Sequence, residues 1–148
     1  MERRVWLSVG DSEWPHFTQA CRDFFEQFRA SRYAGMYVVT LSVDRVQFRQ
    51  PVRVGELVTF FASVNYTGNT SMEVGIKVVS EDIHKGIATH TNSCFFTMVA
   101  VDDDGKPATV PPLSPATPDE RRRHAAAEIR RDMRREMQRR FAAIHAGD

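Results

Sequence analysis

The sequence has few cysteines, no excess of either charge and no long apolar run, and each of these absences excludes a class of protein. Cys21 and Cys94 are the only cysteines and lie far apart, so we expect neither a disulfide framework nor a zinc site. Twenty basic and 19 acidic residues give a net charge of +1, which disfavours a general binder of nucleic acid or anionic lipid. No stretch approaches the roughly 18 apolar residues of a membrane span, and the first residues lack the apolar run of a signal peptide. We therefore expect a cytoplasmic protein that does not bind membranes.

The length and the placement of prolines predict one domain followed by a helix. A chain of 148 residues with 42% hydrophobic residues can build one ordinary core but not two. Five of the seven prolines fall between 107 and 118, which makes that segment a connector. We expect a domain over residues 1–118 and a C-terminal helix over 119–148.

An early helix is predicted from Pro15 to about Gly35. Proline is favoured at the first helical position and glycine just after the last. The apolar residues between them recur at spacings of three and four, which places them on one face. They are Phe17, Cys21, Phe24 and Phe28.

Strands are predicted on either side of this helix. The first is short, at 5–7, and four long ones follow at 36–48, 57–65, 71–79 and 87–101. They are rich in β-branched and aromatic residues, alternate in part, and are separated by turn residues such as Thr67-Gly68-Asn69. Parallel winding would need helices between the long strands, and the pattern has none. The fold class is therefore α+β, with a long curved antiparallel sheet wrapped around the early helix.

The C-terminal helix is predicted by its cap and by its apolar stripe. Thr117 is followed by Pro118 and by two acids, with Glu120 three residues after the cap. The stripe consists of Ile129, Met133, Met137, Phe141 and Ile144. It is expected to pack on the sheet or on a neighbouring subunit. Residues 119–148 hold nine arginines and six acids at helical spacings, so we expect ion pairs along the helix and no nucleic-acid partner.

Five ordered blocks of sequence resemble the cytosolic acyl-CoA hydrolases (acyl-CoA thioesterases) of the hotdog superfamily. The resemblance covers about residues 30–140. A single block would mean little, but five at family-like spacing form a specific signal. The blocks are 39–48 (VTLSVDRVQF), 51–56 (PVRVGE), 68–74 (GNTSMEV), 95–102 (FFTMVAVD) and 105–107 (GKP).

This resemblance implies a hotdog fold and hydrolysis of an acyl-CoA thioester to a fatty acid and free CoA. It further implies a homodimer whose two sheets join edge to edge, and a trimer of such dimers. In this family a helix carboxylate acts with backbone N–H groups at the start of the helix, and no metal or other cofactor takes part. Counted back from residues 30–34 (ASRYA), which match the end of the family's helix, the catalytic carboxylate is Asp23.

The resemblance also implies substrate-binding positions. Asn69, Thr70 and Ser71 match the turn that approaches the CoA arm, and their hydroxyl and backbone groups can form hydrogen bonds with it. Lys106 could meet the CoA phosphates as a point charge. Each of these residues also fits an ordinary turn or a solvated surface.

Residues 1–29 depart from the family pattern, and this leaves an alternative open. The family's Phe-Gly-Gly turn before the helix is replaced here, with Pro15-His16 in place of the glycine pair. Proline has no N–H to offer to an oxyanion. The alternative is a non-catalytic hotdog protein that binds acyl-CoA or only oligomerises. Residues 1–29 could also be truncated or arise from an altered reading frame.

The five histidines do not form a metal-binding motif. They are His16, His84, His90, His124 and His145, and none of them belongs to an H-x-x-x-H or H-E-x-x-H arrangement. His16 stands at the expected start of the helix and could assist Asp23. A hotdog dehydratase, which would use a histidine with a carboxylate, finds no further support in the sequence.

Overall fold

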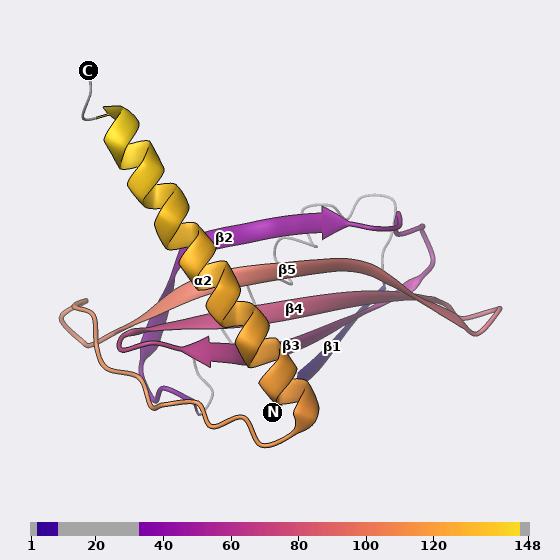
Figure 1. Cartoon of the computed structure of the whole chain (residues 1–148). Coiled ribbons are helices and arrows are strands. Elements are labelled where there is room, and N and C mark those ends of the chain that lie inside the picture. Colours follow the sequence, from indigo (N-terminus) through magenta and orange to yellow (C-terminus); the bar gives the residue numbers. More distant parts are fainter. Residues whose placement is uncertain (1–2, 9–32, 146–148) are drawn as a thin grey trace. The chain divides into compact units, whose positions relative to one another are not determined.

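The described part of the chain contains a five-stranded antiparallel sheet and one long helix (Figure 1). The computed structural model describes residues 3–8 and 33–145. Its elements are β1 (Arg3–Ser8), β2 (Tyr37–Phe48), β3 (Leu57–Thr67), β4 (Ser71–Asp82), β5 (Ile87–Val101) and α2 (Pro118–His145). The early helix predicted from Pro15, with its phenylalanine stripe and Cys21, lies outside the described residues.

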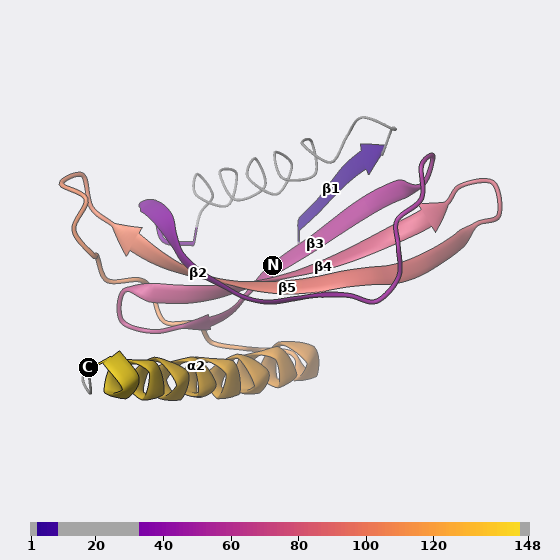
Figure 2. The ribbon, with the colours of Figure 1, turned by 90° about the horizontal axis from the view of Figure 1, so that it is seen from above.

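The strand predictions are confirmed, and the fold class is α+β as expected. The sheet has the order β1-β3-β4-β5-β2, and every neighbouring pair is antiparallel. Strand β5 has the predicted bounds, whereas β3 and β4 run two and three residues beyond them. Figure 2 shows that the long strands bend along their length.

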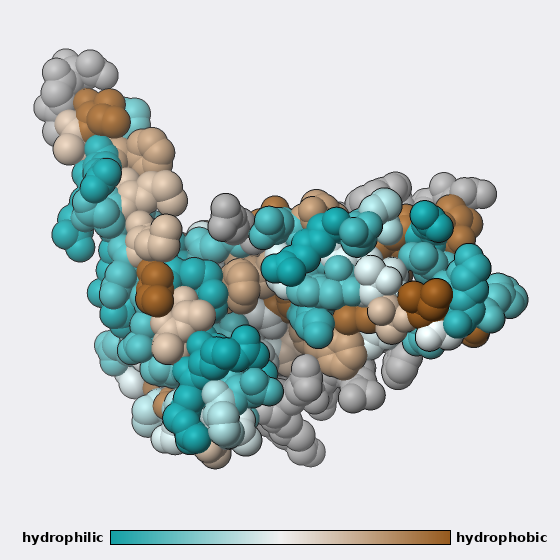
Figure 3. Space-filling view, turned by 45° about the vertical axis from the view of Figure 1, so that its right-hand side comes forward, coloured by the Kyte–Doolittle hydropathy of each residue, from teal (hydrophilic) through white to brown (hydrophobic). Residues whose placement is uncertain are grey.

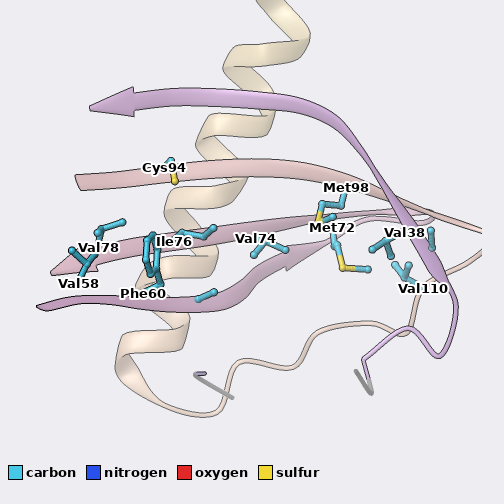
Figure 4. Close-up of a cluster of buried hydrophobic side chains, with 12 residues drawn as sticks. Val38, Val58, Phe60, Met72, Val74, Ile76, Val78, Cys94, Met98 and Val110 are labelled. Carbon is cyan, nitrogen blue, oxygen red and sulfur yellow. The ribbon is translucent and has the colours of Figure 1, made fainter. Parts of the chain in front are cut away.

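The core lies on one face of the sheet, because alternate residues of each strand point to the same side. In β4 these are Met72, Val74, Ile76 and Val78, all at most 3% exposed. They join buried residues of the neighbouring strands and of the connector (Figure 4). The whole cluster is Val38, Val58, Phe60, Ala62, Met72, Val74, Ile76, Val78, Cys94, Met98, Ala100 and Val110. Cys94 is a buried thiol, as predicted.

The opposite face of β4 carries a buried polar pair. Glu73 and Asn65 are 3% and 2% exposed, and the Asn65 amide donates to Glu73 Oε1 at 3.3 Å. Ser63 donates to Asn65 Oδ1 at 2.8 Å. Asn65 lies at the register shift between Val64 and Tyr66, where β3 bulges against β4. Because a buried polar group needs hydrogen-bond partners, this network fixes how the bulge packs.

Residues 113–148 form a separate compact unit that contains α2. Its start is a capping box: the Glu120 amide donates to Thr117 Oγ1 at 3.2 Å, and the Thr117 amide donates to Glu120 Oε2 at 3.1 Å. The backbone N–H groups of Thr117 and Ala116, which both donate to this carboxylate, lower the pKa of Glu120 below its ordinary value of 4.5. The contribution of the carboxylate half of the cap is therefore complete above pH 4.5 and is lost as the pH falls through the lowered pKa.

The polar side of α2 carries ion pairs, as predicted. They include Arg122–Asp119 at 3.2 Å and Arg140–Glu136 at 2.9 Å. The apolar stripe stays exposed, with fractions from 55% at Met137 to 65% at Ile144. Figure 3 shows apolar side chains among hydrophilic ones along this helix. No helix among the described residues is long and apolar enough to cross a membrane.

Replacement of Gly75 by alanine should destabilise the sheet through the polar pair on β4. The added Cβ would lie 2.3 Å from Asn65 Nδ2, so the amide that serves Glu73 must move. We expect Gly75→Ala to lower the free energy of unfolding by about 1–3 kcal/mol in urea titrations. In a double-mutant cycle with Asn65→Ala, the cost of Gly75→Ala should shrink. An unchanged cost in the Asn65→Ala background would contradict this account.

Candidate functional site

The turn between β3 and β4 carries three of the predicted site residues. The Gly68 amide donates to the Ser71 carbonyl at 2.7 Å and closes the turn. A Cβ at Gly68 would lie 3.1 Å from Ser71 Oγ, so glycine allows the serine hydroxyl to sit close to the backbone. Asn69 is exposed, whereas Thr70 and Ser71 are half-buried. Two hydroxyls are thus held at one end of the sheet.

The direction of Thr70 follows from the ladder between β4 and β5. The Ala100 amide donates to the Thr70 carbonyl at 2.9 Å, which extends the ladder one residue beyond Ser71↔Val99. Strand alternation then places Thr70 on the face of Met72 and Ser71 on the opposite face. Thr70 therefore lies at the end of the core face of the sheet.

The connector after β5 returns to this turn. Val101 and Pro107 form an isolated bridge, and the Ala108 amide donates to the Ala100 carbonyl at 2.8 Å. The Val110 amide then donates to the Asn69 carbonyl at 2.9 Å. Val110 itself is 4% exposed and belongs to the core cluster. Residues 107–110 of the connector are thereby fixed against the turn.

Tyr33 joins the turn to Pro111 of the connector. Its hydroxyl donates to the Pro111 carbonyl at 3.4 Å and shares a hydrogen bond with the Thr67 hydroxyl. Burial raises the pKa of the Tyr33 phenol above its ordinary value of 10.0, and the bond to Thr67 offsets part of this rise. The phenol is therefore protonated at neutral pH and can act as a donor.

Lys106 closes the turn that leads into the connector. Its amide donates to Asp102 Oδ1 at 2.9 Å, and its carbonyl accepts from the Asp102 amide at 2.9 Å. Gly105 supplies the positive φ of 76° that this turn needs. The Lys106 side chain is exposed, as a residue that meets a phosphate from solvent should be.

The structure brings some of the predicted site residues together and leaves one outside. Asn69, Thr70 and Ser71 share one turn, and Lys106 begins the segment that reaches it. Asp23, like the Pro15-His16 replacement, lies outside the described residues. Among residues 3–8 and 33–145, no group of His, Cys, Asp and Glu could hold a metal ion.

Sequence reasoning missed the contributions of Tyr33 and Val110 to this region. Val110 acts through its backbone amide, which no motif reveals, and Tyr33 contacts a residue 78 positions away. The sequence offers one signal for this contact. The connector residues run without a break from the family-like 105–107 block to Pro111, and this run is too short to form a helix or strand of its own.

Comparison with known proteins places this geometry in a family. Residues 28–87 match the thioesterase superfamily model. Protein VdlD of Helicobacter pylori is 56% identical over 105 residues, which cover 71% of this chain and 60% of VdlD. The chain thus spans about three fifths of the length of that relative. The acyl-CoA thioester hydrolase YkhA of Bacillus subtilis, described as uncharacterised, is 33% identical over 82% of this chain and 71% of its own.

Solved structures agree with this fold over nearly the whole chain. An apo-hexameric acyl-CoA thioesterase superimposes with a TM-score of 0.81 and 32% identity, covering 93% of this chain and 92% of its own. An acyl-CoA hydrolase from Staphylococcus aureus, in complex with butyryl-CoA, CoA and CoA disulfide, gives 0.80 and 25%, covering 99% and 95%. The fold and its polar turn define a hotdog protein of the thioesterase type. The chain belongs to the thioesterase superfamily, among the acyl-CoA hydrolases.

Proposed function

We propose that this protein hydrolyses acyl-CoA thioesters to the free acid and CoA. The observation that carries the proposal is the turn 67–71, whose backbone is fixed by hydrogen bonds and whose Thr70 lies at the end of the core face, in a chain that superimposes on acyl-CoA hydrolases. Thr70 and Ser71 would form hydrogen bonds with the CoA arm, and Asn69 would add its exposed amide. Residues 1–118 form the thioesterase domain in this proposal, and the cytoplasm is its compartment.

The chemistry requires one carboxylate and donors for an oxyanion. In the proposed reaction Asp23 takes a proton from a water molecule, whose oxygen adds to the thioester carbonyl. Direct attack by the carboxylate, with later hydrolysis of the anhydride, gives the same products. Backbone N–H groups stabilise the oxyanion, and its collapse breaks the C–S bond and releases the CoA thiolate. A thiolate leaves easily, so little acid assistance is needed.

The replacement of the family's glycine pair by Pro15-His16 bears on this step. It removes one N–H donor from the start of the predicted helix. The non-catalytic alternative follows if the remaining donors do not hold the oxyanion. The match to the family model begins at residue 28, which supports a divergent segment before it.

Replacement of Asp23 should abolish most of the turnover. Removing a general base typically costs two to four orders of magnitude, so we expect Asp23→Asn to reduce CoA-thiol release at least about 100-fold. Acyl-CoA substrates from acetyl to palmitoyl would be assayed, with Glu26→Gln on the same predicted helix as the control. If neither the wild type nor Asp23→Asn turns over while both bind CoA, the protein is the non-catalytic hotdog.

Replacement of Lys106 should weaken binding of the nucleotide part of CoA. An exposed ion pair contributes up to about 1 kcal/mol, so we expect Lys106→Ala to raise KM for acyl-CoA by up to about fivefold. The KM for acyl-pantetheine, which lacks the nucleotide phosphates, should stay the same. Lys85→Ala, at the hairpin between β4 and β5, serves as the matched control. Equal increases for both substrates would exclude a phosphate contact.

A homo-oligomer is supported by the exposed edge of the sheet. Strand β2 pairs only with β5 among the described strands. Apart from the buried Val38, its apolar side chains are about half exposed or more, from 48% at Val46 to 64% at Leu41. A long apolar edge strand left uncovered is an aggregation hazard. We therefore propose an edge-to-edge homodimer through β2 and a trimer of such dimers, which has the same number of subunits as the structures described as hexameric.

A charge on β2 should break this dimer. Leu41→Lys places an ammonium in the proposed interface, and we expect sedimentation to show smaller assemblies at micromolar concentration. Ile87→Lys is the matched control, because Ile87 is 58% exposed but belongs to β5. If Ile87→Lys dissociates the assembly and Leu41→Lys does not, the interface is elsewhere.

A further inference from the structure

Three consecutive carbonyls of the turn accept hydrogen bonds. The consecutive carbonyls of Asn69, Thr70 and Ser71 accept hydrogen bonds from the amides of Val110, Ala100 and Gly68, at 2.7–2.9 Å. These donors come from three separate segments: the connector, β5 and the turn itself. The tip of a hairpin is ordinarily solvated and mobile. Here its backbone is fixed from outside.

The outer support of this turn has two anchors. Val110 is 4% exposed, and Figure 4 shows it with Val38, Met72 and Met98 at one end of the core cluster. Its packing fixes the position of the amide that holds Asn69. Tyr33 supplies the second anchor, because one hydroxyl contacts both Thr67 before the turn and the Pro111 carbonyl after Val110. The turn and segment 107–111 are thus joined at two places, through the Val110 amide and through the Tyr33 hydroxyl.

We propose that Tyr33 and the segment 107–111 form a clamp that positions Thr70 and Ser71 for the CoA arm. Neither Tyr33 nor Val110 needs to touch the substrate for this role. The clamp rests on the proposed function, since it acts through the two hydroxyls assigned to CoA binding. It explains why a buried valine stands in a connector whose neighbouring residues, Thr109 and Pro111, are exposed.

A loosened clamp has a defined kinetic signature. The hydroxyls would sample more orientations, so binding of CoA would weaken, while the carboxylate that performs the chemistry is untouched. The effect should therefore appear in KM and in the Kd of CoA, and not in kcat. A merely structural residue would lower stability and leave these constants unchanged well below Tm.

The test uses two clamp variants and one matched control in the full-length chain. Tyr33→Phe removes only the shared hydroxyl, and Val110→Ala shortens the buried anchor. Val58→Ala is the control, because Val58 is 1% exposed in the same cluster but pairs with Ser80, far along β4 from the turn. Each variant is measured for Tm, for kcat and KM by thiol release, for the Kd of CoA by calorimetry, and for hydrogen exchange of the Gly68 and Ala100 amides.

We expect both clamp variants to raise KM and the Kd of CoA about five- to tenfold, with kcat within twofold and faster exchange at the turn. Val58→Ala should lower Tm as much as Val110→Ala and leave the Kd unchanged. If CoA binds equally well in all three variants, or weakens only in proportion to lost stability, the clamp is overturned and the proposed function stands. If the wild type neither binds CoA nor releases thiol, both are overturned.

Discussion

The pairing of β4 with β5 is the interaction on which the rest of the structure depends. It runs from Ser71↔Val99 to Asp82↔Ile87, with one register shift at Val78/Val79. This register decides which residues of β4 are buried in the core and which form the polar network on the other face. Because the bond from Ala100 to Thr70 extends the same ladder, it also decides where the turn's hydroxyls stand. A slip by one residue would exchange the two faces and displace the turn.

The strands could be predicted because their side chains alternate, but the C-terminal ends of β3 and β4 could not, because backbone hydrogen bonding does not depend on side-chain polarity. Tyr66 and Thr67 continue β3, and they pair with Glu73 and Met72. Thr67 is predicted to lie in the turn with Gly68 and Asn69, yet the ladder continues through it until the chain reaches Gly68. At the other end of β4, the polar residues after Val79 likewise stay paired with β5.

The candidate site was only partly predictable for a similar reason. Turn chemistry and the family resemblance indicated residues 69–71, and the turn lies where they placed it. The contacts that hold the turn use backbone amides and a tyrosine distant in sequence, which leave no local pattern. Asp23 lies outside the described residues and stays a prediction. The resemblance is therefore informative about the sheet and its turn, which both fall within its range of residues 30–140.

The proline content of the connector has a thermodynamic consequence. Pro107 and Pro111 fix φ at two of the five positions of segment 107–111, so the free chain already samples fewer conformations there. Ordering this segment against the turn then costs less conformational entropy than ordering a flexible segment of equal length. Two backbone hydrogen bonds and the burial of one valine can hold such a stiff segment against the turn. The same contacts would not hold a glycine-rich segment of equal length. The stiffness of this segment in the unfolded chain thus reduces the contact area that is needed to hold it against the turn.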